Sequence, residues 1–389
     1  MALSVKQLPT GVTYLPAHND NIFVLSESSS AVTNNYNFKF LCDVKDTSNN
    51  VLARLKVPIH YDSTNKGVFN IGQILEGYVT YDWDILDTVA VDCQNSRFGY
   101  RCSFGYEYST GATSAIIQTT GVTTVTGMTV WNAALDPYDF TAYNQATYLM
   151  GAASSAKFLT NNFNKRIHID QKEWVYLLGG SSVNNLLVTF SGGTTTTITG
   201  VSGVIARFPI GANISGGIPI GTTSYTIQPR DASNVAVGAT YTITIDPRCS
   251  RYDNVDLFFL NRLGAVESFR FNKIRRDTFE IERKSFSKNP YTLNNSAVTY
   301  AMNRGSHSKS SYHTASSQVI ELNSDLLTDT ESVWLRELIM SPLVWMYDTE
   351  LTAVNIVDSA YIQKSLINDK VFSLNLKVEI SMQDKSQRL

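Results

Sequence analysis

Acidic side chains that stand close together along the chain are the first candidates for chemistry. Asp82, Asp84 and Asp87 occur within one short stretch. In a strand, Asp82 and Asp84 would point the same way, and paired carboxylates can bind Ca²⁺ or serve as the acid and base of a glycosidase. The stretch lacks the glycine and the final glutamate of a calcium loop. We therefore interpret these acids as a solvated strand end, and Asp253 and Asp256 likewise.

Histidine and cysteine are the other side chains that could bind a metal. Only His307 and His313 of the five histidines share a segment, and no cysteine or carboxylate stands beside them. Because zinc usually takes three or four protein ligands, we expect an exposed polar loop there, without metal. The four cysteines lack C-x-x-C spacing and lie in or beside predicted strands, which favours buried free thiols made in a reducing cytosol. They are Cys42, Cys93, Cys102 and Cys249.

Sequence motifs of catalysis are missing from the chain. It has no G-x-S-x-G, H-E-x-x-H, phosphate-binding P-loop or G-x-G-x-x-G pattern. We expect a protein that is not an enzyme and that uses no cofactor.

Basic residues gather between Arg270 and Lys288, interleaved with phenylalanines and three acids. A basic surface with aromatic side chains is one pattern of nucleic-acid binding. The acids and the alternating pattern fit better with an interface in which arginine pairs with a carboxylate of a neighbouring subunit. The candidate interface residues are Arg262, Arg270, Arg275, Arg276, Arg283 and Lys284.

Strands must position most of these residues. Aromatic or apolar residues alternate with mostly polar ones over 36–42 and 98–108, which is the period of a half-buried strand. Further strands are expected at 53–59 and 68–81. The aromatic face of 98–108 requires a facing sheet, so we predict a β-sandwich or a similar layered sheet.

The middle of the chain is poor in charge. Residues 109–135 carry none and are rich in Thr and Gly, which predicts strand and turn; Arg207 is the one charged residue in 174–229, which predicts a second β unit. Between them, Asp136 could cap a short helix that has Pro137 in its first turn and continues toward Met150. Edge strands without charged residues favour aggregation, so we expect partner subunits to cover them.

Charge content changes near Pro247, from about 13% charged residues before it to about 25% after it. Strands are expected at 269–286 and 371–380. Thr328 and Glu331 form a capping-box pattern ahead of a helix that Pro342 ends. We predict a mainly β fold of two or three sandwich-like domains with one or two short helices: 1–135, 136–247 with a helical lead-in, and 248–389 with a helix near 329–340.

Composition excludes several classes of protein. The 389 residues are 43% hydrophobic and 17% charged, with a net charge of −2. The chain is therefore globular, and it lacks the basic excess of a protein built for nucleic acid. Its first residues do not form a signal peptide, and no run of 18 apolar residues occurs, so we expect neither export through a signal peptide nor a membrane span.

Two segments carry a resemblance to a known class. Residues 258–264, with the sequence FFLNRLG and a Phe-rich strand after them, and residues 334–342, WLRELIMSP, resemble virion structural proteins of tailed bacteriophages, of the sort found in phages of Bacteroidota. The resemblance covers about residues 250–389 and the style of the first hundred. It implies a subunit of a tail, baseplate or head-to-tail ring, without enzymatic activity, made in the host cytoplasm and assembled with copies of itself and other virion proteins.

Two other functions stay open. A carbohydrate-binding or adhesin module would use exposed aromatic rings as sugar platforms, with Trp83, Trp131 or Trp174 as candidates and a host-surface glycan as partner. A glycan depolymerase would use the acids around Asp82.

Overall fold

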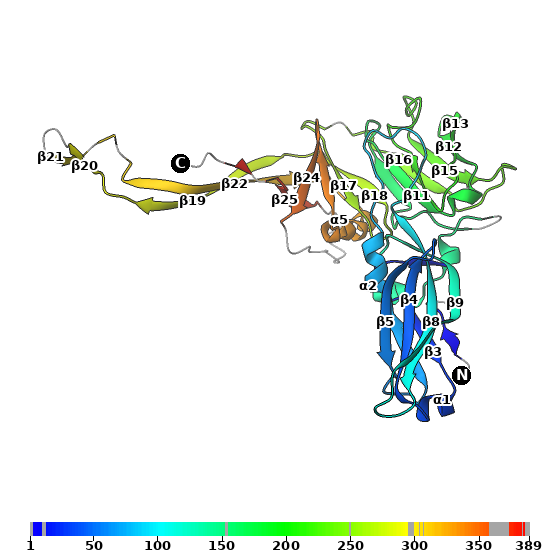
Figure 1. Ribbon diagram of the computed structural model, residues 1–389. Helices are drawn as coiled ribbons and strands as arrows, with labels where there is room; N and C mark the ends of the chain where they lie inside the picture. Colours follow the sequence, from blue (N-terminus) through cyan, green and yellow to red (C-terminus); the bar gives the residue numbers. More distant parts are fainter. Residues whose placement is uncertain are drawn as a thin grey trace. The chain divides into compact units, whose positions relative to one another are not determined.

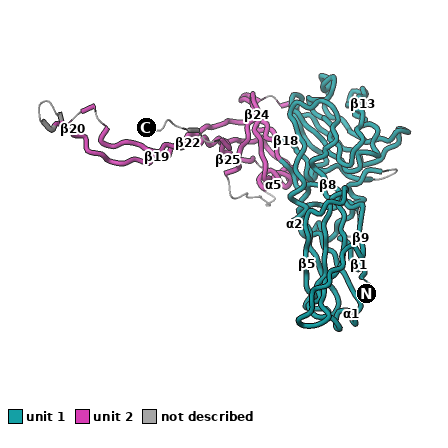
Figure 2. Tube along the Cα trace, in the orientation of Figure 1, with its two compact units in different colours: residues 1–247, 260–268 teal, residues 248–259, 269–389 magenta. Residues whose placement is uncertain are grey.

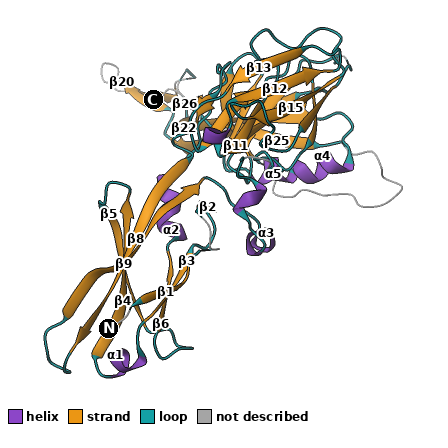
Figure 3. Cartoon of the chain, turned by 90° about the vertical axis from the view of Figure 1, so that its right-hand side faces the viewer, coloured by secondary structure: helices purple, strands orange, loops and turns teal. Residues whose placement is uncertain are grey.

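Strands dominate the chain and the helices are short (Figures 1 and 3). The computed structural model describes residues 3–9, 13–151, 155–248, 250–294, 299–302, 304–305, 307–357, 373–382 and 384–385. The predicted mainly β fold is confirmed. The chain forms two compact units: unit 1 comprises residues 1–247 and 260–268, and unit 2 comprises residues 248–259 and 269–389 (Figure 2).

The first half of unit 1 contains two sheets that share one apolar core (Figure 3). The five-stranded sheet has the order β2 (Tyr14–Pro16), β9 (Ile117–Trp131), β8 (Arg97–Ser109), β4 (Tyr36–Asp46) and β5 (Val51–Pro58). The three-stranded sheet has the order β1 (Ser4–Gln7), β3 (Ile22–Ser26) and β6 (Lys66–Asn70). Helix α1 (Ser29–Thr33) precedes β4.

Aromatic packing joins these two sheets, as the alternation over 98–108 predicts. Phe104 of β8 lies with its ring centre 5.3 Å from that of Phe23 and 6.3 Å from that of Phe69. The Thr/Gly-rich stretch is β9, whose pairing with β8 shifts register twice. Gly121 and Gly127 have positive φ at these bulges, a backbone conformation that glycine adopts without strain. The extra residues fall in β9, so β8 keeps its alternation.

The strand expected over 68–81 is wrong beyond residue 70. After β6 the chain forms α2 (Gly72–Leu75) and the 3-10 turn η1 (Glu76–Tyr78), and 79–90 contain no helix or strand. The apolar residues of this segment reach the core from one face of a helical turn, with Leu75 fully buried. Short apolar runs do not distinguish strand from helix.

The second half of unit 1 has a separate core between two sheets. The five-stranded sheet has the order β10 (Asn164–Ile167), β16 (Tyr241–Ile245), β15 (Ser224–Arg230), β12 (Asn185–Phe190) and β13 (Thr195–Thr199). The other contains β11 (Trp174–Leu178), β14 (Ile205–Pro209) and β7 (Val91–Asp92). Three short helices accompany them: α3 (Pro137–Thr141), η2 (Gln145–Thr147) and η3 (Gly180–Ser182). The predicted cap of α3 is confirmed, since the Asp136 side chain accepts from the N–H of Tyr138.

Unit 2 is built on one large sheet and two short helices that share an apolar core. The sheet has the order β18 (Val266–Phe271), β17 (Val255–Leu260), β23 (Val344–Tyr347), β24 (Leu351–Ile356), β25 (Asn375–Ile380), β22 (Lys309–Asn323) and β19 (Arg276–Ser287), and β26 (Asp384–Lys385) pairs with β22. The loop between β17 and β18, with the adjoining strand ends at 260–268, belongs to unit 1. A separate hairpin, β20 (Tyr291–Asn294) and β21 (Thr299–Met302), follows β19 along the chain.

The predicted helix near 329–340 is confirmed as α4 (Asp329–Trp334) followed directly by α5 (Arg336–Met340). Thr328 and Glu331 form the predicted capping box. The strand expected at 269–286 is two strands, because residues 272–275 lie outside the sheet between β18 and β19. Of the strand expected at 371–380, β25 begins at Asn375, and residues 371–372 lie outside the described residues. No helix among the described residues is long and apolar enough to cross a membrane.

Candidate functional site

The first of the basic candidates of unit 2, Arg270, lies inside the unit. Its Nε and Nη2 donate to the two carboxylate oxygens of Asp256 at 2.6 and 2.8 Å, and both side chains are less than a tenth exposed. The interpretation of Asp256 as a solvated acid is therefore wrong. A buried bidentate pair of this kind is satisfied within the chain and leaves Arg270 no exposed guanidinium for a neighbouring subunit.

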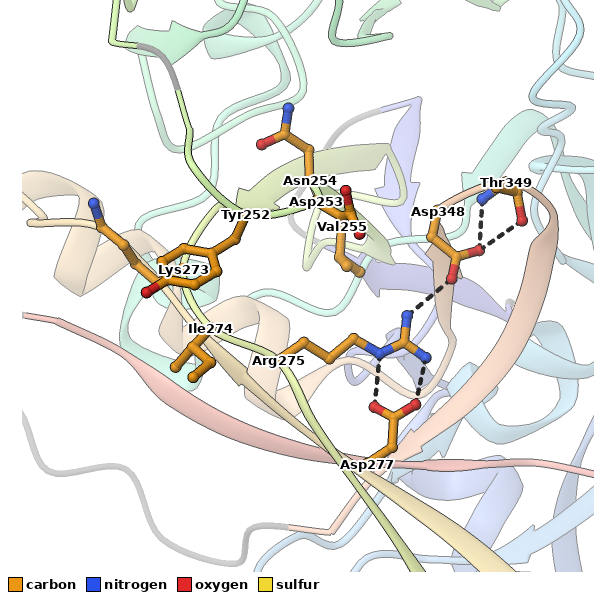
Figure 4. A pocket seen from close by; sticks show the side chains of 10 residues that line it. All are labelled: Tyr252, Asp253, Asn254, Val255, Lys273, Ile274, Arg275, Asp277, Asp348 and Thr349. Carbon is orange, nitrogen blue, oxygen red and sulfur yellow. Dashed lines mark hydrogen bonds and ion pairs between the residues drawn. The ribbon is translucent and has the colours of Figure 1, made fainter.

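Arg275 lines a cavity of about 640 Å³ in unit 2 (Figure 4). Its guanidinium donates to both carboxylate oxygens of Asp277, at 2.7 and 2.9 Å, and to Asp348 at 2.9 Å. Hydrogen bonding to Asp277 raises the pKa of Arg275. Partial burial opposes ionisation of Asp348, but the N–H of Thr349 and the Arg275 guanidinium outweigh it, so the pKa of Asp348 lies below its usual value.

The rest of the cavity wall is mixed. Lys273 lies 3.5 Å from Asp325 and is half-exposed. Tyr252 presents an exposed ring, and Asp253 is exposed beside it. The cavity wall thus combines the ion pairs of Arg275 with an exposed aromatic ring and an exposed acid.

The remaining candidates of unit 2 lie on β19. We call residues 276–287 of β19 and residues 309–318 of β22 the arm. Figure 1 shows the arm as a two-stranded ribbon that extends beyond the other strands of its sheet. Every residue of β19 is exposed, including Phe279 (61%) and Ile281 (54%).

The register of the arm assigns its side chains to two faces. Residues directly opposite in an antiparallel pair share a face, and β22 pairs Ile320 with Asp277 and Gln318 with Phe279. Ile320 is fully buried in the core of unit 2. The face with Asp277, Phe279, Ile281 and Arg283, which we call the core face, therefore continues the core side of the sheet outward along the arm.

Charged residues on the arm differ in how they are paired. On the opposite face, Arg276 lies 3.6 Å from Glu321, and Lys284 lies 3.6 Å from Glu282. Arg283, on the core face, has no ion pair within the described part of the chain. Arg262 belongs to unit 1, where it lies 3.5 Å from Asp136, so it is not part of the arm.

The acids around Asp82 organise a loop of unit 1. The Asp82 carboxylate accepts from the N–H groups of Asn95 and Ser96 and from the Asn95 amide. The backbone carbonyl of Asp82 accepts from the guanidinium of the buried Arg207, which also pairs with the Asp87 carboxylate. Burial lowers the pKa of Arg207 to about 10. The carboxylates of Asp82 and Asp87 are thus engaged in holding residues 82–96 against β14.

The histidine pair falls partly in a strand. His313 pairs with Lys284 in β22 and not in a loop, which corrects the loop expected over 305–313. The polar residues there predict a loop, because long-range pairing with β19 leaves no local signal in the sequence. No three His, Cys, Asp or Glu side chains gather as a metal site in the described residues. Three cysteines are buried and free, and the fourth, Cys249, lies outside those residues.

The tryptophans proposed as sugar platforms lie in or beside the cores of unit 1. Trp131 and Trp174 are at most 2% exposed. Trp83 packs edge-on against Trp174, with ring centres 5.7 Å apart. Trp131 and Trp174 therefore present no open ring face to a sugar.

Sequence reasoning missed one buried ionic cluster in unit 1. Lys165 Nζ lies 2.5 Å from Glu173, and Glu173 accepts from the Ser268 hydroxyl at 2.6 Å. Burial raises the pKa of Glu173 despite these partners. One signal was present: Lys165 and Ile167 both point into the core from β10, so a charged residue occupies a core position of the alternation.

Comparison with known proteins adds little. No protein-family model and no curated protein matches the chain. Among solved structures, the dimeric latent PorU from Porphyromonas gingivalis matches with a TM-score of 0.20 and 7% identity, over 83% of this chain and 32% of that one. A similarity at this level does not establish a common fold.

Proposed function

We propose that this chain is a non-enzymatic structural subunit of a bacteriophage virion, in a tail, baseplate or head-to-tail ring, and that it self-assembles through the arm. The observation that carries the proposal is the exposure of β19. An isolated two-stranded ribbon is marginally stable in water, and three or more strands or a packed face are needed for independent stability. The arm has neither along most of its length.

The arm is also the place where unit 2 exposes alternating apolar side chains on an edge strand. Edge strands with free N–H and C=O groups pair readily with other chains, and monomeric proteins usually shorten or cover them. A 12-residue exposed edge is what a subunit that adds strands to a neighbour needs. The assignment to a virion rests on the resemblance of residues 258–264 and 334–342.

Oligomeric state tests this function. The purified chain should form dimers or larger regular assemblies at micromolar concentration, seen by light scattering after size exclusion and by negative-stain microscopy. Deleting residues 278–316 and joining the ends with a short Gly/Ser linker should leave a folded monomer. A wild-type chain that remains monomeric at 100 µM, about a hundred times a micromolar dissociation constant, would overturn the proposal.

Carbohydrate binding is the second candidate, supported by the cavity beside Tyr252. Its exposed ring and the paired charges around Arg275 suit a sugar. Glycan-array binding that is lost in Tyr252→Ala and kept in Tyr61→Ala, a substitution of an exposed tyrosine in unit 1, would favour this function. Assembly without glycan binding would favour the virion subunit.

A further inference from the structure

We propose that β19 pairs antiparallel with β19 of a second copy of this chain about a twofold axis at Glu280. This inference rests on the proposed self-assembly and specifies its contact: Phe279 lies opposite the partner's Ile281, and Asp277 lies opposite the partner's Arg283. Two arms would then form one four-stranded ribbon.

The backbone of β19 is open to such pairing. It is the last strand in the order of the unit 2 sheet, and β22 is its one neighbour among the described residues. Half of its N–H and C=O groups therefore point away from β22, at the free edge. Antiparallel addition of a strand satisfies these groups in the same way as within a sheet.

The core face of β19 is self-complementary in one register. Its side chains, read along the strand, are Asp277, Phe279, Ile281 and Arg283. An antiparallel second copy presents the same side chains in reverse order. Phe279 then lies opposite Ile281 and Asp277 lies opposite Arg283, and the twofold axis repeats each pair once. Opposite residues must share a face, so the sum of their numbers must be even.

Neighbouring registers lack this match. Lowering by two the sum of the residue numbers of opposite residues places Asp277 opposite Ile281 and Arg283 opposite Arg275. Raising that sum by two places Phe279 opposite Arg283. Both leave charges against apolar side chains, so the register centred on Glu280 is favoured.

The charged partners are free to take part. Arg283 has no ion pair in the described part of the chain. Asp277 already accepts two bonds from Arg275 and one from Gln318, but a carboxylate has about four acceptor sites. Each Asp277 can therefore also bind the partner's Arg283.

The opposite face is less favourable at its centre. There, Glu280 faces its own symmetry mate, and Arg276 faces the partner's Lys284. The two cations have counter-ions in their own chain at 3.6 Å, whereas no ion pair of Glu280 is present in the described residues. The register therefore predicts that Glu280→Thr tightens the dimer, because it removes a like-charged pair and adds a β-branched residue.

Two complementary variants test the register. Arg283→Asp and Asp277→Arg each place like charges opposite one another in their own dimers, and each should weaken dimerisation at least about tenfold in analytical ultracentrifugation. Mixed in equal amounts, they should form a heterodimer of near wild-type affinity, because both ion pairs return, one in its wild-type sense and one with its charges exchanged. Lys288→Asp, which changes the same charge just beyond β19, is the matched control and should dimerise normally.

Cysteine cross-linking gives a readout that does not depend on charge. Glu280 is the one residue of β19 that lies opposite itself, at a distance that a disulfide spans. Under mild oxidation, Glu280→Cys should form a disulfide-linked dimer, whereas Thr278→Cys and Glu282→Cys should do so only when the two are mixed. Circular dichroism of each variant verifies that it is folded.

The outcomes separate the contact from the function. If the wild-type chain assembles and the two charge variants assemble equally well, the register is wrong while self-assembly stands. The register is also contradicted if Thr278→Cys alone or Glu282→Cys alone cross-links as efficiently as Glu280→Cys. A wild-type chain that neither assembles nor cross-links at 280 overturns both.

Discussion

The buried pair Lys165 and Glu173 shows what single residues contribute to unit 1. Both side chains are at most 3% exposed, and their partners come from β10, from the segment before β11 and from Ser268. Charges taken out of water are stabilised by such partners but rarely gain stability over apolar residues of the same size. The pair therefore stabilises the fold chiefly in the sense that breaking it is costly.

Glu173→Gln should destabilise the chain by about 3–5 kcal/mol, because it removes one charged member of a buried ion pair. Urea unfolding measures this difference. The matched double variant, Lys165→Met with Glu173→Leu, removes both members of the pair together and should cost clearly less. Equal costs for the two variants would show that Lys165 is satisfied by other groups.

Asp348 makes the stability of unit 2 depend on acid pH. Its pKa in the folded chain is below the ordinary value of 3.8, so the ionised form is favoured by folding. The stabilisation is complete above that ordinary value and is lost as the pH falls through the folded pKa. Asp348→Asn should therefore lower the stability of the chain at pH 6 and make stability fall less between pH 5 and pH 2. Thermal unfolding at each pH measures both effects. An unchanged pH dependence would contradict the role of the Arg275 contact.

At the scale of elements, the capping box of α4 is a local feature with a local cost. The Thr328 hydroxyl accepts from the N–H of Glu331, and the Glu331 carboxylate accepts from the N–H of Thr328. Thr328→Ala should destabilise the helix by about 1 kcal/mol, seen as faster hydrogen exchange in peptides covering 328–340. Thr330→Ala, at an exposed neighbouring position, should have little effect.

The arm should behave differently from the core strands. Phe279→Ser combined with Ile281→Ser should leave the free energy of unfolding of the monomer within about 0.5 kcal/mol, because these side chains are exposed there. The same change should abolish association, measured by light scattering. Loss of monomer stability would mean that the arm packs within its own chain.

Elements differ in how far the sequence predicts them. Alternation located β4 and β8, and the Thr/Glu spacing located α4, because both patterns arise from neighbours within a few residues. Residues 72–78, expected as part of a strand, are helical, and residues 272–275 interrupt the strand expected at 269–286. In both places, the packing of distant residues decides the backbone, and the local pattern carries no trace of it.

At the scale of the whole molecule, the net charge of −2 provides no long-range field to drive association. The electrostatic part of association through β19 would instead come from a few exposed ion pairs. Raising NaCl from 0.1 to 1 M shortens the screening length from about 10 to about 3 Å. The dimer of the wild-type chain should therefore weaken as salt is raised, whereas the dimer of Arg283→Asp should strengthen. Sedimentation at each salt concentration measures both dissociation constants. Identical salt trends would exclude the pairing of Asp277 with the partner's Arg283.

The amino-acid sequence by itself determined the mainly β character, which residues of the long alternating strands face the core, and the capped helix, since each depends on spacing along the chain. Only the tertiary structure decided which basic residues are available. Arg270 is paired inside with Asp256, and Arg275 is held by Asp348, 73 residues away, while Arg283 remains exposed. Ion pairing depends on which distant residues the fold brings within about 4 Å of one another, and that distance is not encoded in any local pattern.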